Sequence, residues 1–184
     1  MGILDFFNRK KKTPHYDVTD IRITDLEKDY ILDYDLESWI VTKMYEYDWG
    51  NNFFTREFVI NNGAKNLYLH IEDDDELEIS VTKKIGIRTL GEHIVDAIEE
   101  TEKPPKKIVY DNQIYYRDSE NMGFVRNVDN EDWSEVISWL YLDDTEELLI
   151  TIEQTGESNY EATIGEYISE YKVSNILPQN TTND

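Results

Sequence analysis

Two alternating apolar strands joined by an acidic turn are the feature that most constrains how this chain of 184 residues can fold. Along residues 67–81, apolar side chains occupy alternate positions on either side of the turn, at Leu67, Leu69, Ile71, Leu77, Ile79 and Val81. Successive side chains of a strand point to opposite faces, so these residues share one face of a hairpin. The pattern returns at residues 148–164, and both stretches therefore predict antiparallel strands.

The order of matches between the two halves predicts a tandem duplication of one β unit. Residues 110–115 resemble residues 34–39 at an offset of 76, and residues 139–141 and 148–153 resemble 58–60 and 67–72 at an offset of 81. Residues 160–164 follow 77–81 at an offset of 83. The offset never decreases along the chain, as insertions in the loops between matched strands would produce. Chance similarity among alternating strands is the alternative.

Local signals place the remaining elements. Asn61-Asn62-Gly63 predicts a hairpin turn, because Asn and Gly tolerate positive φ. The alternation of Ile21 and Ile23 indicates a strand, and residues 90–100 have the apolar spacing of a helix that Thr89 would cap. Pro104-Pro105 would end this helix, because proline cannot continue its hydrogen bonds.

We therefore expect a mainly β protein made of two similar antiparallel units, each a meander or a partly open small barrel, joined by one short α-helix. The expected boundaries are a basic amphipathic tail at 1–14, a first β unit at 15–88, a helix and Pro/Lys linker at 89–107, a second β unit at 108–178, and a disordered terminus at 179–184.

The composition narrows the function classes. The net charge of −22 leaves a body that repels nucleic acid and anionic lipid, so direct nucleic-acid binding is not expected. The absence of Cys excludes disulfides, Cys-ligated zinc and thiol nucleophiles, and fits a reducing cytosol. We predict a cytoplasmic protein.

The first twelve residues are the exception to this acidity. Ile3, Leu4, Phe6 and Phe7 fit one face of a short helix, and Arg9, Lys10, Lys11 and Lys12 follow at once. Such a segment can lie on an anionic membrane surface, here the inner membrane, although the attachment would be weak. A solvated, frayed terminus is the alternative.

Aromatic residues gather around a Gly-Asn turn, and Tyr45, Tyr47, Trp49 and Phe53 are the candidate binding residues. Tyr and Trp are frequent anchors of protein interfaces, which makes a protein partner the expected ligand. Core packing between the two units is the alternative.

The acidic turn is a weak candidate for a metal site. Asp73, Asp74 and Asp75 offer the oxygen ligands that Ca²⁺ or Mg²⁺ prefers, but the turn lacks the central glycine of an EF-hand loop. A solvated turn is the alternative that we favour. No zinc, P-loop, dinucleotide or nucleophile-elbow motif is present, so neither a cofactor nor catalytic residues are predicted.

Three segments stand out, namely residues 33–39 (DYDLESW), 45–50 (YEYDWG) and 69–77 (LHIEDDDEL). They resemble DUF4178, a bacterial domain of unknown function, and residues 152–157 are similar to that family's second acidic hairpin. The resemblance covers residues 20–178 and implies a β-rich domain. It implies no activity and no catalytic residue.

These features together predict a non-catalytic acidic binding or adaptor module, whose partner is a protein or a positively charged ligand. One alternative is a nucleic-acid mimic that inhibits a DNA-binding protein, which would need carboxylates in two regular rows. The other is a carboxylate-based enzyme, which would need a deep pocket with two or more convergent carboxylates.

Overall fold

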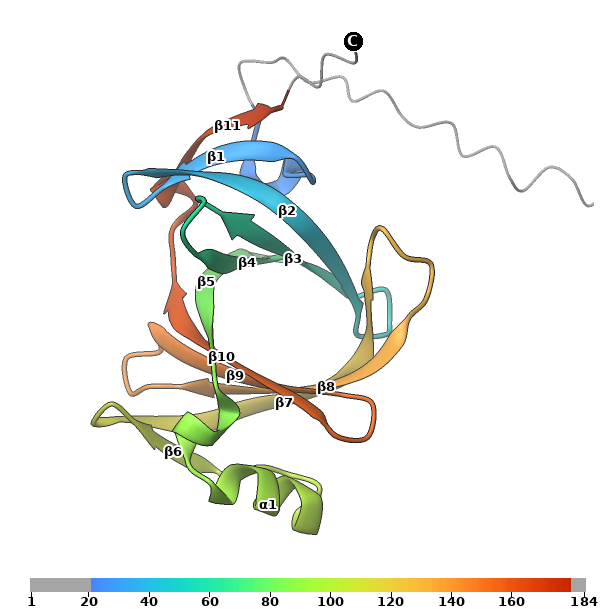
Figure 1. Cartoon of the computed structure of the whole chain (residues 1–184), viewed down its shortest axis with the longest axis vertical. Helices are drawn as coiled ribbons and strands as arrows, with labels where there is room; N and C mark the ends of the chain where they lie inside the picture. Colours follow the sequence, from blue (N-terminus) through green and yellow to red (C-terminus); the bar gives the residue numbers. More distant parts are fainter. Residues whose placement is uncertain (1–20, 180–184) are drawn as a thin grey trace, which may run out of the picture.

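The computed structural model describes residues 21–179, which form one antiparallel sheet and a single α-helix (Figure 1). The strands are β1 (Tyr30–Tyr34), β2 (Glu37–Asp48), β3 (Phe54–Asn61), β4 (Asn66–Asp73), β5 (Leu77–Ile85), β6 (Lys107–Tyr110), β7 (Gln113–Asn127), β8 (Ser134–Leu142), β9 (Leu148–Thr155), β10 (Asn159–Tyr167) and β11 (Val173–Pro178). The helix is α1 (His93–Thr101), and the short 3-10 turns are η1 (Ile23–Asp25), η2 (Ile87–Leu90) and η3 (Glu170–Lys172). The expectation of a mainly β fold with one helix is confirmed.

The middle of the sheet closes into a ring. The strand order is β11-β1-β2-β3-β4-β5-β10-β9-β8-β7-β6, and β2 also pairs with β7. The strands from β2 to β7 in this order therefore form a closed ring, which Figure 1 shows, while β1, β11 and β6 lie outside the closed part. The closing pairs join Tyr45–Asp48 of β2 to Phe124–Asn127 of β7, and we call this junction the seam.

Each half of the chain contributes one meander to the ring. Strands β1 to β5 pair in sequence order, as do β6 to β10, and β5–β10 and the seam join the two runs. Both runs begin with a hairpin whose two turn residues have positive φ, Asp35-Leu36 and Asp111-Asn112, and both have a register shift soon afterwards. These features lie 76 residues apart, as the predicted duplication requires. The duplication itself stays a prediction.

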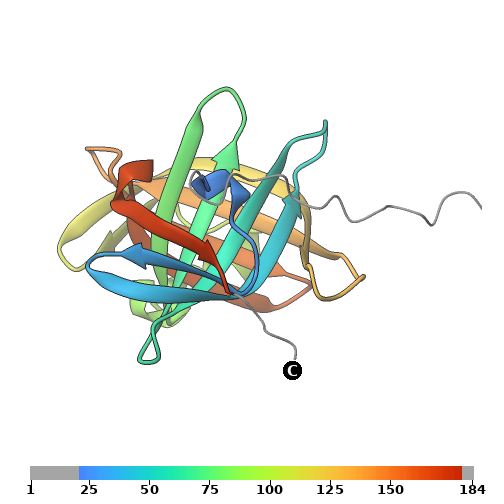
Figure 2. The same cartoon turned by 90° about the horizontal axis from the view of Figure 1, so that it is seen from above.

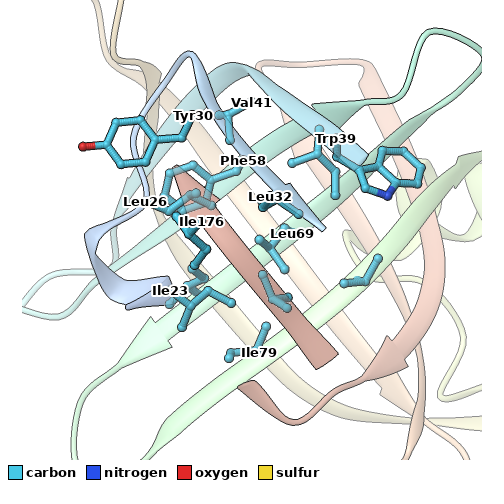
Figure 3. Packing of buried hydrophobic residues seen from close by; sticks show 14 of the residues in the cluster. Ile23, Leu26, Tyr30, Leu32, Trp39, Val41, Phe58, Leu69, Ile79 and Ile176 are labelled. Atoms are coloured by element: carbon cyan, nitrogen blue, oxygen red, sulfur yellow. The ribbon is translucent and has the colours of Figure 1, made fainter. Parts of the chain in front are cut away.

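The hydrophobic core is divided into two clusters on the outside of the ring. The first lies between the strands β2 to β5 and a cap made of β1, β11 and η1, and Figure 3 shows Ile23, Leu26, Leu32 and Ile176 of this cap facing the strands. Figure 2 shows β1 and β11 crossing over the ring strands. The second cluster lies between β8 to β10 and a cap made of β6, η2 and α1. The apolar strand faces therefore point away from the ring centre.

Helix α1 shows how such a cap is built. Ile94 and Ile98 share one side of the helix, as their spacing predicts, and both are buried in the second cluster. The helix ends where Glu102 adopts positive φ, shortly before Pro104-Pro105. The predicted Thr89 cap is wrong: Thr89 lies in η2 and its hydroxyl donates to the Gly86 carbonyl, and the helix begins at His93.

The predicted strand at Ile21 and Ile23 is also wrong, because Ile23 starts η1 and is buried under the first cap. Alternation over so short a stretch did not distinguish a strand from a turn that packs one apolar side chain. In the described part of the chain, no helix is long and apolar enough to cross a membrane.

Candidate functional site

The polar faces of the ring strands point toward the ring centre. On β4, Leu69 and Ile71 are buried in the outer core, and the alternating Tyr68, His70 and Glu72 face inward. On β9, Ile150 and Ile152 pack outward while Thr151 and Glu153 face inward. Side chains alternate along a strand, so when one face of a strand is buried outside the ring, the opposite face points into the ring.

This interior contains a cavity of about 130 Å³, which we call the chamber. Its walls come from β3, β4, β5, β7, β8, β9 and β10, with the loop between β2 and β3. The acidic and basic side chains of the chamber are Glu57, Glu72, Glu78, Lys84, Glu153 and Glu161, and the aromatic ones include Trp49, Phe53, Tyr68, His70 and Tyr167. Serine and threonine hydroxyls line much of the remainder.

The chamber adjoins a further cavity at each end of the ring. A cavity of about 300 Å³ shares Glu57, Tyr68 and Glu153 with it. A cavity of about 670 Å³ shares Phe53 and Tyr167 with it at the other end. The chamber is therefore flanked by a cavity on each side along the ring axis.

Two chamber carboxyls, Glu57 on β3 and Glu153 on β9, have pKa values raised toward the neutral range. Burial raises the pKa of Glu57 to about 8, and the negative charge of Glu153 adds to this shift. Burial also raises the pKa of Glu153 to about 7, although a hydrogen bond from Tyr47 opposes the shift. The interaction between them is mutual, so the two groups titrate as a pair.

The one lysine of the chamber already has partners. Lys84 Nζ lies 2.7 Å from Glu161 Oε2 and 5.2 Å from the centre of the Tyr68 ring. Burial alone would lower the pKa of Lys84, but the hydrogen bond and charge of Glu161 outweigh it and raise this pKa. The side chains of Lys84 and Glu161 are 45% and 47% exposed, so this ammonium group lies between a carboxylate and an aromatic face where the chamber meets the cavity of about 300 Å³.

Tyr47 connects the aromatic residues to the carboxyl pair. Its hydroxyl donates to Glu153 Oε2 at 3.3 Å, from β2 across the ring to β9. Its ring stacks on Trp49 with centroids 5.3 Å apart and meets the edge of His70 at 5.8 Å. Burial raises the pKa of Tyr47 and lowers the pKa of His70 to about 4, so both are neutral at pH 7.

The ring is tight at both junctions between the two meanders. A Cβ added to Gly123 at the seam would lie 2.3 Å from the Asp48 carbonyl oxygen, and one added to Gly165 would approach the Val81 carbonyl oxygen still more closely. Glycine lets the strands approach this closely because it has no side chain. Arg126 also binds Glu46 across the seam through Nε and Nη2, at 2.8 and 2.5 Å.

The four predicted aromatic residues come together at the ring interior. Trp49 and Phe53 line the chamber, and Tyr45 and Tyr47 line the adjoining cavity of about 300 Å³. Tyr47 is only 3% exposed. These side chains therefore face an internal space, whereas the sequence suggested an external interface or the core between two units.

The other predicted sites lie apart from the chamber. Asp73, Asp74 and Asp75 are exposed around the β4–β5 turn, and within residues 21–179 no group of three or more His, Asp or Glu side chains could hold a metal ion. The proposed membrane tail, residues 1–12, lies outside the described residues.

Sequence reasoning missed the charged residues of the chamber, Glu57, Lys84 and Glu153, and assigned His70 only to a polar strand face. The available signal was the polar alternation of Glu78, Ser80, Thr82 and Lys84 on β5 and its counterparts on other strands. This pattern is also typical of a sheet with one solvated face, so closure of the ring was needed to bring these residues together.

Comparison with known proteins gives one finding. The family model described as "Domain of unknown function (DUF4178)" matches residues 27–170, which include every strand of the ring. No curated protein and no solved structure matches this chain. The chain therefore belongs to the DUF4178 family, as its three sequence segments indicated.

Proposed function

We propose that this protein is a non-catalytic binding module that takes a small polar ligand into the ring. The observation that carries the proposal is the chamber itself, where carboxyl, hydroxyl and aromatic groups from separate strands converge on one cavity. Concave sites with a few convergent polar groups and shifted pKa values are the usual form of small-molecule sites.

The surrounding structure suits this role. The ring strands are held from outside by two hydrophobic clusters, so the polar interior does not have to supply the core of the fold. A binding wall on packed strands is also more rigid than one on loops. The chamber can therefore stay polar and hydrated at little cost to folding.

The test is native mass spectrometry of the purified protein after incubation with the small-molecule fraction of a cell lysate. We expect one retained adduct in the native protein and none in Ser138→Trp, which places an indole in the chamber. Ser134→Trp is the matched control, since Ser134 is exposed near the start of the same strand and is outside the chamber wall. Failure to retain any adduct under these conditions, or an equal adduct in Ser138→Trp, would contradict the proposal.

A carboxylate-based enzyme is the second candidate, and one observation favours it. Glu57 and Glu153 provide the convergent carboxyl groups in a pocket that acid–base catalysis requires. The lysate experiment distinguishes the two functions. A binding module releases its ligand unchanged. An enzyme converts the ligand to a product, and Glu57→Gln or Glu153→Gln would stop the formation of that product. Recovery of such a product would replace the proposed binding role.

A further inference from the structure

We propose that the ligand of the chamber is a small organic cation whose ammonium or guanidinium group is seated among Glu57, Glu153 and Tyr47. This inference rests on the proposed binding function and names the chemical class of its ligand. Four properties of the chamber support it: its charge balance, the missing partner of Glu57, the pairing of Lys84 and the aromatic surface beside the carboxyls.

The chamber has an excess of acidic groups. Five glutamates line it, namely Glu57, Glu72, Glu78, Glu153 and Glu161, against a single basic side chain that is charged at pH 7, Lys84. His70 does not change this balance, because its burial keeps it neutral. An anionic ligand would meet repulsion throughout this space, whereas a cation would meet attraction.

Glu57 is the group most in need of a partner. Within residues 21–179 it forms no ion pair and accepts no hydrogen bond, although it lies inside the ring and lines both the chamber and the adjoining cavity. Glu153 receives hydrogen bonds from the hydroxyls of Tyr47 and Ser138, but has no basic partner in the same described region. Both glutamates are partly buried, so their carboxylates are less well solvated than carboxylates in open water, and a cationic ligand would supply the counter-ion that they lack.

The groups that face Glu57 come from several strands. Tyr45 on β2 and His70 on β4 are its register partners on either side. The charges of Glu153 on β9, Lys84 on β5 and Glu161 on β10 also act on it, and Lys84 alone favours its ionised form. Because Lys84 is bound to Glu161, it does not form an ion pair with Glu57.

Lys84 shows that the chamber walls can hold an ammonium group. Its Nζ lies between the Glu161 carboxylate and the face of Tyr68. A second set of side chains has the same chemistry: the carboxyls of Glu57 and Glu153 lie beside the stacked rings of Tyr47 and Trp49. Among the described residues, no ammonium group is paired with this second set. Carboxylates combined with aromatic surface are the usual elements of sites for organic cations.

Proton exchange follows from this arrangement. Near neutral pH the Glu57–Glu153 pair carries a proton that limits the repulsion between its members. A bound cation would offset the same repulsion and lower the pKa values of the pair, so binding should release the proton. Proton release distinguishes binding at this pair from binding to an exposed carboxylate, which is already ionised.

The experiment titrates the full chain with n-butylammonium and guanidinium, and with their neutral counterparts n-butanol and urea, by isothermal calorimetry at constant ionic strength. Repeating each titration in two buffers with different ionisation enthalpies counts the protons released. We expect at least one cation to bind about tenfold more tightly than its neutral counterpart and to release a proton near pH 7, as a charge-assisted contact would produce.

The matched variants are the double change Glu57→Gln with Glu153→Gln, and Glu99→Gln on the exposed side of α1. The double variant should lose about tenfold or more in cation affinity and all proton release, whereas Glu99→Gln should keep both. Near-ultraviolet circular dichroism verifies that each variant is folded. Equal binding of the cations and their neutral counterparts, or equal loss in Glu99→Gln, would overturn the inference. A neutral or anionic adduct found in the lysate experiment would overturn the inference and leave the binding function standing.

Discussion

At the scale of single residues, the protein places ionisable groups on the inner face of the ring, where they are partly shielded from solvent. Glu57 and Glu153 have raised pKa values and His70 a lowered one, in each case chiefly because of burial. Such groups cost stability in their charged forms. Their presence on the inner face of the ring is better explained by a ligand than by the fold, because the outer face already contains the two hydrophobic clusters.

The first prediction is a pH dependence of stability. Glu57 binds its proton more tightly in the folded state than in the unfolded chain, so folding stability falls as pH rises from about 4.5 to about 8. Glu57→Gln removes this titration and should be more stable than the native protein by about 1–2 kcal/mol at pH 9, after allowance for solvent in the cavity. Urea unfolding at pH 5 and pH 9 measures the difference. An advantage of equal size at both pH values would contradict the explanation.

The second prediction concerns Leu36, a fully exposed residue at φ 63° in the first hairpin turn. A branched side chain costs about 1 kcal/mol in this left-handed conformation, and glycine does not bear that cost. Leu36→Gly should therefore raise the free energy of unfolding by about 0.5–1 kcal/mol, measured by urea denaturation. Leu177→Gly, on the exposed part of β11, is the control and should not stabilise the protein. A destabilised Leu36→Gly would show that the turn is not held in this conformation.

At the scale of the elements, the ring depends on the two junctions between its meanders. The seam pairs β2 with β7 over a short stretch, and Gly123 leaves room there for the Asp48 carbonyl and the Trp49 ring. The Glu46–Arg126 pair crosses the same junction, but it is about one-third exposed and contributes no more than about 1 kcal/mol. Close backbone approach therefore matters more to closure than this ion pair.

The third prediction tests that approach. Gly123→Ala should reduce the free energy of unfolding by about 1–3 kcal/mol, because the added methyl group meets backbone atoms that cannot move independently. Gly86→Ala is the matched control, since its Cβ would meet only the Thr89 methyl group at 3.7 Å. Thermal and urea unfolding measure the stability of both variants. If Gly123→Ala is no less stable than Gly86→Ala, the seam is looser than described.

Many of the strands and turns could be predicted from the sequence. The outward alternation of Leu69, Ile71, Ile79 and Val81 identified their strands and buried face, and Asn61-Asn62-Gly63 identified a hairpin. The start of α1 was misplaced because Thr89 has the chemistry of a helix cap but lies in a 3-10 turn. The seam carried no local signal, since pairing between β2 and β7 joins residues about 80 positions apart in the chain.

At the scale of the whole molecule, closure of the sheet turns polar strand faces into the wall of an internal cavity. The sequence predicted both the polar faces and the cluster around Tyr47 and Trp49, but not that they face each other. A solvated sheet and a closed ring have the same alternation, and only the long-range pairing distinguishes them. The candidate site was therefore beyond sequence reasoning, apart from its aromatic members.

The fourth prediction concerns membrane binding by the N-terminal tail. Residues 1–12 carry four basic residues and one acid, in contrast to the acidic remainder, with Ile3, Leu4, Phe6 and Phe7 beside the basic run. We expect the full chain to sediment with vesicles that contain anionic lipid, weakly and less at high salt, and a chain without residues 1–12 to stay in solution. Unchanged sedimentation after the deletion would contradict a membrane role for the tail.

Thiol labelling inside the ring shows whether its interior is an accessible chamber that favours cations. The chain has no cysteine, so Ser138→Cys places a unique thiol in the chamber, and Ser134→Cys places one at the exposed start of the same strand. The reaction rates of each thiol with a cationic and an anionic methanethiosulfonate of similar size are compared. For each thiol we take the ratio of its reaction rate with the cationic reagent to its rate with the anionic reagent. We predict that this ratio is about ten times larger at position 138 than at position 134. If the thiol at position 138 reacts with neither reagent, or prefers the cation no more than the thiol at position 134 does, the ring interior is not an accessible chamber that favours cations.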